Sequence, residues 1–509
     1  MLEKGPLMSY NTLTQSTESV GGINFAYKEA TMYSLEQQHL FPIPLSLELQ
    51  ILYNAAQHYD WERIKKEIGS KFKEASEIFH RKQKQSPGCP NKNKSSVEVT
   101  FFDLDDYKGT GPLEVPLNPK GAGKNPQPFL AYLKAVEFAP ILHIEQNMEA
   151  IALHLRSNSD YLRACGFNYP PSTRALQDFD QIMSENHLWE RFREQTYQVN
   201  VDSGLINESK EDTLNIDNTH VLAYSTPNKV IKQCRECSNF NTCSDKVSTD
   251  ETADWYVKSK CKIFYAHQIG ISQLAQSGAP LERVVLSGRQ YEPDSLEPLL
   301  NKQRHKYENI KLQKINADGI FNTQTCKDTI QRYYPFVELY SPINPKGRLK
   351  DFEQPARGIK KVTKHGNVKC IAGHQMVFLS KDENLQAYMF GCPVFNPEAR
   401  AKLINMGIDV SNITCSCKEQ CAPRALNGRL YRAPRKLLKK VNWDRPQFSY
   451  RYWFVYKLRT KIERLFGRMK KRFKMAIIYR RGLNNIEAHI DKFMALINIM
   501  ANIQGYYPV

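Results

Sequence analysis

Between residues 213 and 340 the hydrophobic pattern changes repeatedly from the period of a strand to the period of a helix, and this constrains the fold most strongly. Strand-like alternation covers 213–223, 262–271, 283–288, 311–317 and 336–340, and helical periodicity covers 293–308 and 323–334. The order is three strands, a helix, a strand, a helix and a strand. This order predicts a mixed α/β domain built on a five-stranded sheet.

The flanking regions indicate further parts. Helical spacing of Leu45, Leu49, Leu52 and Ala56 predicts one helical unit from about Leu45 to Lys82. Ser172 is a good N-cap for a helix over 173–184, and it follows a Pro-containing turn that favours either a helix-turn-helix-like DNA module or a plain helical bundle. The predicted organisation is 1–80 (helical), 81–127 (flexible linker, with a possible strand at Val97–Leu104), 128–200 (helical, DNA-end-binding), 210–345 (first part of the α/β core), 346–445 (Cys-rich insertion) and 446–509 (helical second part, with helices 447–474 and 484–503).

The stretch from Tyr456 to Arg481 is strongly basic and contains a single acid, Glu463. On a helix, Tyr456, Arg459, Glu463 and Lys470 fall within roughly 60° of one another. A lone carboxylate among an aromatic ring and two cations suits a helix that presents a metal ligand to nucleic acid. The alternative is a solvated helix in which Glu463 pairs with Arg459, worth about 0.3–0.5 kcal/mol.

The net charge of the chain indicates which kinds of molecule it binds. The 509-residue chain carries a formal charge of +18. Such a balance favours a polyanion, although a membrane surface would also attract it. No apolar run is long enough for a membrane span, and the N-terminus lacks the apolar core of a signal peptide. We therefore expect a cytoplasmic protein whose twelve cysteines are thiols or metal ligands rather than disulfides.

Two further carboxylates occupy positions suited to chemistry on phosphodiesters. Asp217 lies in the middle of a predicted strand among small polar neighbours, and Asp318 lies where a strand ends and Gly319 begins a turn. For each, the alternative is an ordinary Asp at a turn. Cutting or joining a phosphodiester commonly uses two divalent ions about 3.5–4 Å apart, held by a few converging carboxylates.

These residues together resemble the YREK-type DDE transposases of bacterial insertion sequences. The spacing of Tyr456, Arg459, Glu463 and Lys470 matches the family signature at every position, Asp217-Asn218-Thr219 is similar to its first Asp motif, and Asp318 with Phe321 is similar to its second. Gly278–Leu281, Tyr291–Ser295 and the stretches 162–167 and 172–179 also look like family segments. The resemblance covers roughly 130–509 and leaves the first 125 residues without an assigned role.

The resemblance implies a ribonuclease H-like core interrupted by an insertion domain, with a helical N-terminal domain. It implies that Asp217, Asp318 and Glu463 ligate two Mg²⁺ or Mn²⁺ ions, and that Arg459 and Lys470 hold phosphates. Tyr456 would contact the DNA backbone or an unstacked base, and Arg464 and Lys471 would add contacts to DNA. The expected activity is cleavage at the ends of a mobile element and transfer of the freed 3′-hydroxyl into target DNA. Partners would be double-stranded DNA (terminal inverted repeats and target) and a second copy of the chain, in the bacterial cytoplasm at the nucleoid.

Cysteines form two groups that could hold structural zinc. The first is Cys234, Cys237, Cys243 and Cys261, and the second is Cys370, His374, Cys392, Cys415, Cys417 and Cys421. The alternative is a set of buried reduced thiols. Two other functions stay open: a domesticated, inactive transposase that only binds DNA, and a zinc-stabilised nucleic-acid scaffold in which the acids are incidental.

Overall fold

The computed structural model describes residues 46–85, 127–225, 250, 252–259, 262–344, 351–438 and 441–507. Leu47–Val509 is one unit, and of Met1–Ser46 only Ser46 is described. The possible strand at Val97–Leu104, most of the predicted linker and the whole first cysteine group lie outside the described residues.

The helical unit predicted from about Leu45 to Lys82 consists of several helical segments. A new helix begins after Asp60, because the Asp60 side chain accepts the amide of Arg63. The indole of Trp61 then donates to the carbonyl of Ala55 across the break, at 2.8 Å. The segments are α1 (Leu47–His58), α2 (Trp61–Ile64), a π-helical turn (Lys65–Gly69) and α3 (Ser70–Gln85).

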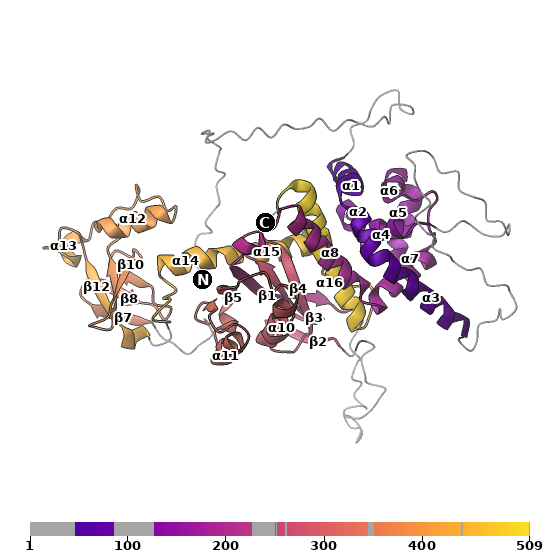
Figure 1. Ribbon diagram of the computed structural model, residues 1–509. Helices are drawn as coiled ribbons and strands as arrows, with labels where there is room; N and C mark the ends of the chain where they lie inside the picture. Colours follow the sequence, from indigo (N-terminus) through magenta and orange to yellow (C-terminus); the bar gives the residue numbers. More distant parts are fainter. Residues whose placement is uncertain are drawn as a thin grey trace, which may run out of the picture. The chain divides into compact units, whose positions relative to one another are not determined.

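A second group of helices follows, each begun by a polar cap. Asn147, Asn158 and Ser172 accept backbone amides of the helices that they precede, which confirms the cap predicted at Ser172. The buried apolar residues of these helices and those of the central sheet belong to one hydrophobic cluster. The helices are α4 (Phe129–Phe138), α5 (Met148–Ser157), α6 (Ser159–Cys165), α7 (Thr173–Glu185) and α8 (Leu188–Asp202), with 3₁₀ turns at Ala139–Leu142 and Glu208–Lys210 (Figure 1).

The central sheet is mixed, and the five predicted strands are confirmed. Its strands are β1 (Thr213–Leu222), β2 (Asp254–Ser259), β3 (Lys262–Leu274), β4 (Pro280–Ser287), β5 (Lys314–Ala317) and β6 (Glu338–Tyr340). The order is β2-β3-β1-β5-β6, and β4 also pairs with β3. Strand β3 runs antiparallel to β1, β2 and β4, whereas β1, β5 and β6 are parallel. Strand β2 was not predicted from the sequence. The molecule is thus a mixed α/β protein, as expected.

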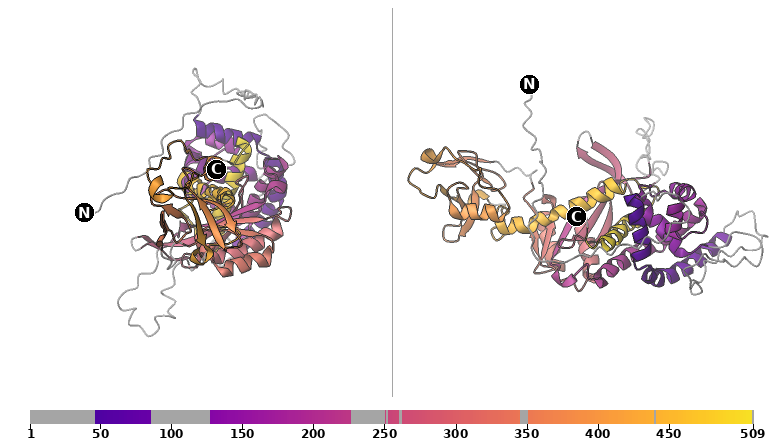
Figure 2. Two further views of the ribbon diagram at one scale, coloured as in Figure 1. Left: turned by 90° about the vertical axis from the view of Figure 1, so that its left-hand side faces the viewer. Right: turned by 90° about the horizontal axis from the view of Figure 1, so that it is seen from above.

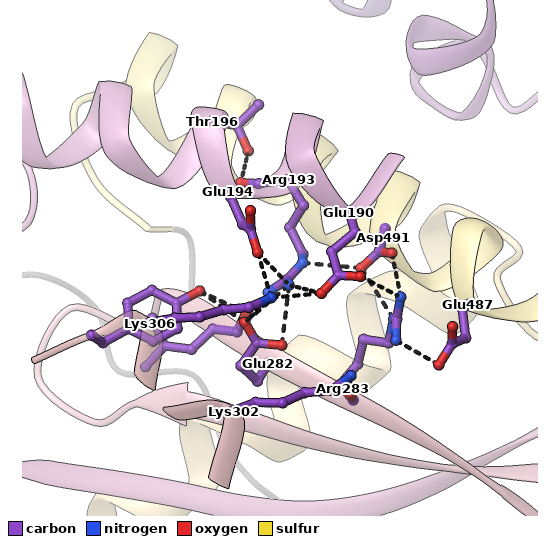
Figure 3. Close-up of polar contacts among 12 residues, drawn as sticks. Glu190, Arg193, Glu194, Thr196, Glu282, Arg283, Lys302, Lys306, Glu487 and Asp491 are labelled. Carbon is purple, nitrogen blue, oxygen red and sulfur yellow. Dashed lines mark hydrogen bonds and ion pairs between the residues drawn. The ribbon is translucent and has the colours of Figure 1, made fainter. Parts of the chain in front are cut away.

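A buried ionic network fastens helices to this sheet (Figure 3). Arg193 of α8 lies 3.0 Å from Glu282 of β4 and 3.0 Å from Asp491 of α16 (Leu483–Gln504). Arg283 of β4 reaches Asp491 at 2.8 Å and Glu487 at 2.7 Å. Because both guanidinium groups are almost fully buried, each needs these carboxylates to offset its desolvation.

Two helices follow β4 and β5 in the chain and lie against each other. They are α10 (Leu296–Lys306), preceded by the 3₁₀ turn Glu292–Ser295, and α11 (Gln324–Tyr333), preceded by the 3₁₀ turn Gly319–Phe321 (Figure 1). Both were expected from the sequence.

The inserted region contains two small sheets that the sequence analysis did not foresee. One is β7 (Phe352–Ala356), β8 (Ile359–Val362) and β9 (Val368–Cys370); the other is β10 (Val377–Asp382), β11 (Ala387–Gly391) and β12 (Leu430–Pro434). Its helices are α12 (Pro397–Asn405) and α13 (Lys418–Cys421), with a 3₁₀ turn at Arg435–Leu438. Their shared core is small and includes Val362, Tyr388 and Phe390.

The basic stretch folds as four consecutive helical segments rather than one helix. They are α14 (Tyr450–Tyr456), a 3₁₀ turn (Lys457–Arg459), α15 (Thr460–Gly467) and a π-helical turn (Arg468–Arg472), which appear as one yellow rod in the right-hand view of Figure 2. The later helix expected over 484–503 is confirmed as α16. Among the helices of the described ranges, none has the length and apolar character that crossing a membrane requires.

Candidate active site

Asp217 lies on β1 with its side chain mostly buried. One carboxylate oxygen accepts the backbone amide of Asn218 at 3.0 Å, and the other accepts Arg459 Nη2 at 2.9 Å. The side chain is 14% exposed, so the carboxylate is shielded but still reachable. The Asp217–Arg459 contact joins the first strand of the sheet to the basic helix.

Asp318 follows the last residue of β5, the parallel neighbour of β1. Its side chain accepts the amide of Gly319 and caps a 3₁₀ turn, and its carbonyl accepts the hydroxyl of Ser341 at 2.6 Å. A Cβ at Gly319 would lie 3.1 Å from the carbonyl oxygen of Pro342, so glycine allows the two loops to approach. Asp318 is exposed, which leaves its carboxylate open to solvent at the carboxyl edge of the sheet.

Arg459 is the link between the acids. One of its nitrogens contacts Asp217 and another contacts Glu463, one helical turn later. Arg459 is 13% exposed, whereas Glu463 is 53% exposed. The Arg459–Glu463 pair that the sequence suggested as the simple alternative is therefore present, but the same guanidinium also holds Asp217.

The charges of Asp318 and Glu463 both reach Asp217. Burial raises the pKa of Asp217 to about 6; the charges of Asp318 and Glu463 add to the rise, and Arg459 opposes it. Burial also raises the pKa of Tyr456 to about 12, with the same three carboxylates contributing. Burial alone would lower the pKa of Arg459, but Asp217, Tyr456 and Glu463 outweigh it and hold that pKa above its ordinary value.

Two asparagines that the sequence analysis missed attach the basic helix to the sheet. Asn215 and Asn316 are opposite each other on the parallel strands β1 and β5, and both are fully buried. Asn215 Nδ2 donates to the carbonyl of Leu458 at 3.0 Å, and Asn316 Nδ2 donates to the carbonyl of Val455 at 3.1 Å. These bonds satisfy carbonyls near the 3₁₀ break and fix the position of the segment that carries Arg459.

A third asparagine joins the first acid motif to the Tyr291–Ser295 segment. Asn218 donates to the carbonyl of Glu292 at 2.9 Å and accepts the hydroxyl of Ser295 at 3.0 Å. Gly270, the β3 partner of Asn218, makes room for this, because a Cβ there would lie 2.7 Å from Cβ of Ser295. The backbone amide of Asn218 thus binds Asp217, and its side chain holds the Glu292–Ser295 turn beside β1.

The remaining predicted DNA contacts lie further along the basic helix. Arg464 and Lys471 are exposed, while Lys470 is partly buried in the π-helical turn. Their positions leave Arg464 and Lys471 open to a polyanion.

The donor set suits a hard divalent cation, because Mg²⁺ prefers carboxylate oxygens. In the described residues, however, no three His, Cys, Asp or Glu side chains stand in an arrangement that could hold a metal ion. Arg459 lies in contact with both Asp217 and Glu463 and partly neutralises them. Holding a metal there therefore requires Arg459 to withdraw from at least one carboxylate.

The comparisons with known proteins add little. No family model matches the chain. A curated protein, the zinc metalloproteinase-disintegrin-like BmMP of Bungarus multicinctus, is 34% identical over 87 residues, which is 16% of this chain and 13% of that protein. The chain thus spans only a small part of that relative's length, and no family follows from the match.

Proposed function

We propose that the chain is a DDE-type DNA transposase with a ribonuclease H-like core. The observation that carries the proposal is that Arg459 contacts both Asp217, 242 residues earlier in the chain, and Glu463, while Asp318 directly follows the neighbouring strand β5. The sheet supports it as well, since β4-β3-β1-β5-β6, antiparallel in its first half and parallel in its second, is the order that a ribonuclease H-like fold requires.

In this function Asp217, Asp318 and Glu463 would hold Mg²⁺ or Mn²⁺, which when bound polarises the phosphate and activates the attacking oxygen. Arg459 would turn from the acids to a phosphate, for which its planar fork is suited. Tyr456 would border the DNA, and Arg464 and Lys471 would contribute sequence-independent attraction. The helical region 128–200 as a DNA-end-binding part, and action as a dimer, remain predictions.

The reaction has two displacements at phosphorus. Water attacks the phosphate at the element end, the bond from phosphorus to the 3′ oxygen breaks, and a 3′-hydroxyl is released. That hydroxyl then attacks a target phosphodiester, and the bond from phosphorus to the target's own 3′ oxygen breaks. Asn215 and Asn316 would not touch the reacting atoms; they would position the helix that carries Arg459 and Glu463.

A second candidate, a DNA-binding protein without catalysis, is favoured by one observation: Arg459 already neutralises two of the acids. Strand-nicking assays with Mg²⁺ on DNA carrying the terminal repeats separate the two functions. The transposase proposal expects the wild type to nick and Glu463→Gln to bind without nicking, with Glu297→Gln, an exposed acid on α10, as the matched control. Nicking by Glu463→Gln at the wild-type rate would refute the assignment of this acid.

A further inference from the structure

The last part of the insertion has little to hold it together. Between α12 and β12 lie about two dozen residues whose only helix is the four-residue α13. Few apolar side chains of this loop are buried; Val410 and Ala422 are among them. A segment this poor in buried apolar area usually needs a cross-link or a metal to stay folded.

Thiols from four separate places face one small cavity beside this loop. Cys370 ends β9, Cys392 follows β11, Cys415 lies in the loop and Cys421 ends α13. All four line a cavity of about 20 Å³. A space of that size accommodates a single water or ion and nothing larger.

Glycines shape the backbone beside two of these sulfurs. Cys370 begins a turn in which Gly373, with a φ of +84°, donates its amide to the carbonyl of Cys370 at 2.9 Å. At Gly358, also with positive φ, a Cβ would lie 3.0 Å from the sulfur of Cys421. These two glycines let the chain turn tightly beside both thiols, so that two sulfurs from separate segments can lie at the same cavity.

We propose that Cys370, Cys392, Cys415 and Cys421 bind one structural Zn²⁺ through four thiolates. Four soft sulfur donors without an open position are the ligands of a structural zinc site. Since no three such side chains in the described residues are yet arranged to hold an ion, binding turns the thiols further into the cavity. The metal would join the β7–β9 sheet, the β10–β12 sheet and the loop into one body.

Two neighbours of the cavity are left out of the ligand set for stated reasons. His374 lines the same cavity, and its Nε2 lies 2.8 Å from the carbonyl of Thr414. Four thiolates already complete a tetrahedral zinc site, so the imidazole is not needed as a ligand. Cys417 also lines the cavity, but it lies only two residues after Cys415, and we assign the ligand of this segment to Cys415, which the test below checks. The zinc site is independent of the proposed transposase activity.

The test uses the full chain and zinc as the probe. Zinc content is measured by mass spectrometry for the wild type and for single Cys→Ser variants. Cys370→Ser, Cys392→Ser, Cys415→Ser and Cys421→Ser should each lose about one zinc per chain relative to the wild type. Cys417→Ser and Cys326→Ser, a buried thiol of α11, should keep the wild-type content. Unchanged zinc in the first four would overturn the proposal.

A second measurement avoids variants that fail to fold. The wild type is alkylated with iodoacetamide before and after chelation, and each cysteine is quantified. The four proposed ligands should be protected until chelation and react afterwards, while Cys417 should react in both states. Equal reactivity of the four with and without chelator would overturn the site.

Discussion

Replacing Asp491 by Asn should destabilise the chain by about 3 kcal/mol, because it leaves two buried guanidinium groups short of a counter-charge. Asp491 is 1% exposed and contacts Arg193 at 3.0 Å and Arg283 at 2.8 Å. Breaking a buried ion pair costs about 3–5 kcal/mol. The lower end applies here, since Arg193 keeps Glu282 and Arg283 keeps Glu487.

The matched control is a surface ion pair between an Arg and a carboxylate with a similar N···O distance. Arg332 and Glu297 lie 2.9 Å apart with side chains 63% and 51% exposed, so Arg332→Gln should cost less than about 1 kcal/mol. Urea unfolding followed by near-ultraviolet circular dichroism gives both free-energy changes. If Asp491→Asn cost no more than Arg332→Gln, the argument that burial makes this network essential would be wrong.

Three further predictions concern the site, pH and DNA. Arg459→Gln should bind Mn²⁺ more tightly than the wild type in the absence of DNA, because it frees Asp217 and Glu463, and calorimetric titration would contradict this by finding equal affinities. Burial lowers the pKa of His489 from 6.5 to about 4, so its contribution to stability is complete above pH 6.5 and is lost as pH falls through 4. That loss is about 3 kcal/mol, and His489→Gln should lack it in urea unfolding at stepped pH. Arg464→Gln should make the plot of log affinity for DNA against log salt concentration less steep, by about one unit of slope. An unchanged slope in anisotropy titrations would exclude a phosphate contact of Arg464.

The sequence was most informative where the hydrophobic period is strong. Strand β1 and helix α16 appear where alternation and helical periodicity predicted them. The break at Asp60 was missed because a cap depends on one side chain rather than on periodicity. The strands of the insertion were missed because strands of three to six residues, several of them carrying Lys, Arg or Pro, give weak alternation.

Part of the candidate active site could also be predicted from the sequence. Spacing alone identified Arg459 and Glu463 as helical neighbours, and the structure adds Asp217 to that pair. Asn215 and Asn316 could not be assigned beforehand, because their role depends on two strands pairing and on a helix crossing them. Their one signal was an amide side chain in the middle of an apolar strand, where Asn is otherwise disfavoured.

The most direct test of the central claim is cleavage of DNA that carries the element's terminal repeats, with Mg²⁺, by the wild type, Asp318→Ala and Asp328→Ala. Asp328 is an exposed acid on α11 and serves as the control. The account predicts cuts at the repeat ends by the wild type and Asp328→Ala, and binding without cuts by Asp318→Ala. Binding without cutting by all three proteins would contradict the transposase and favour a DNA-binding protein that does no chemistry.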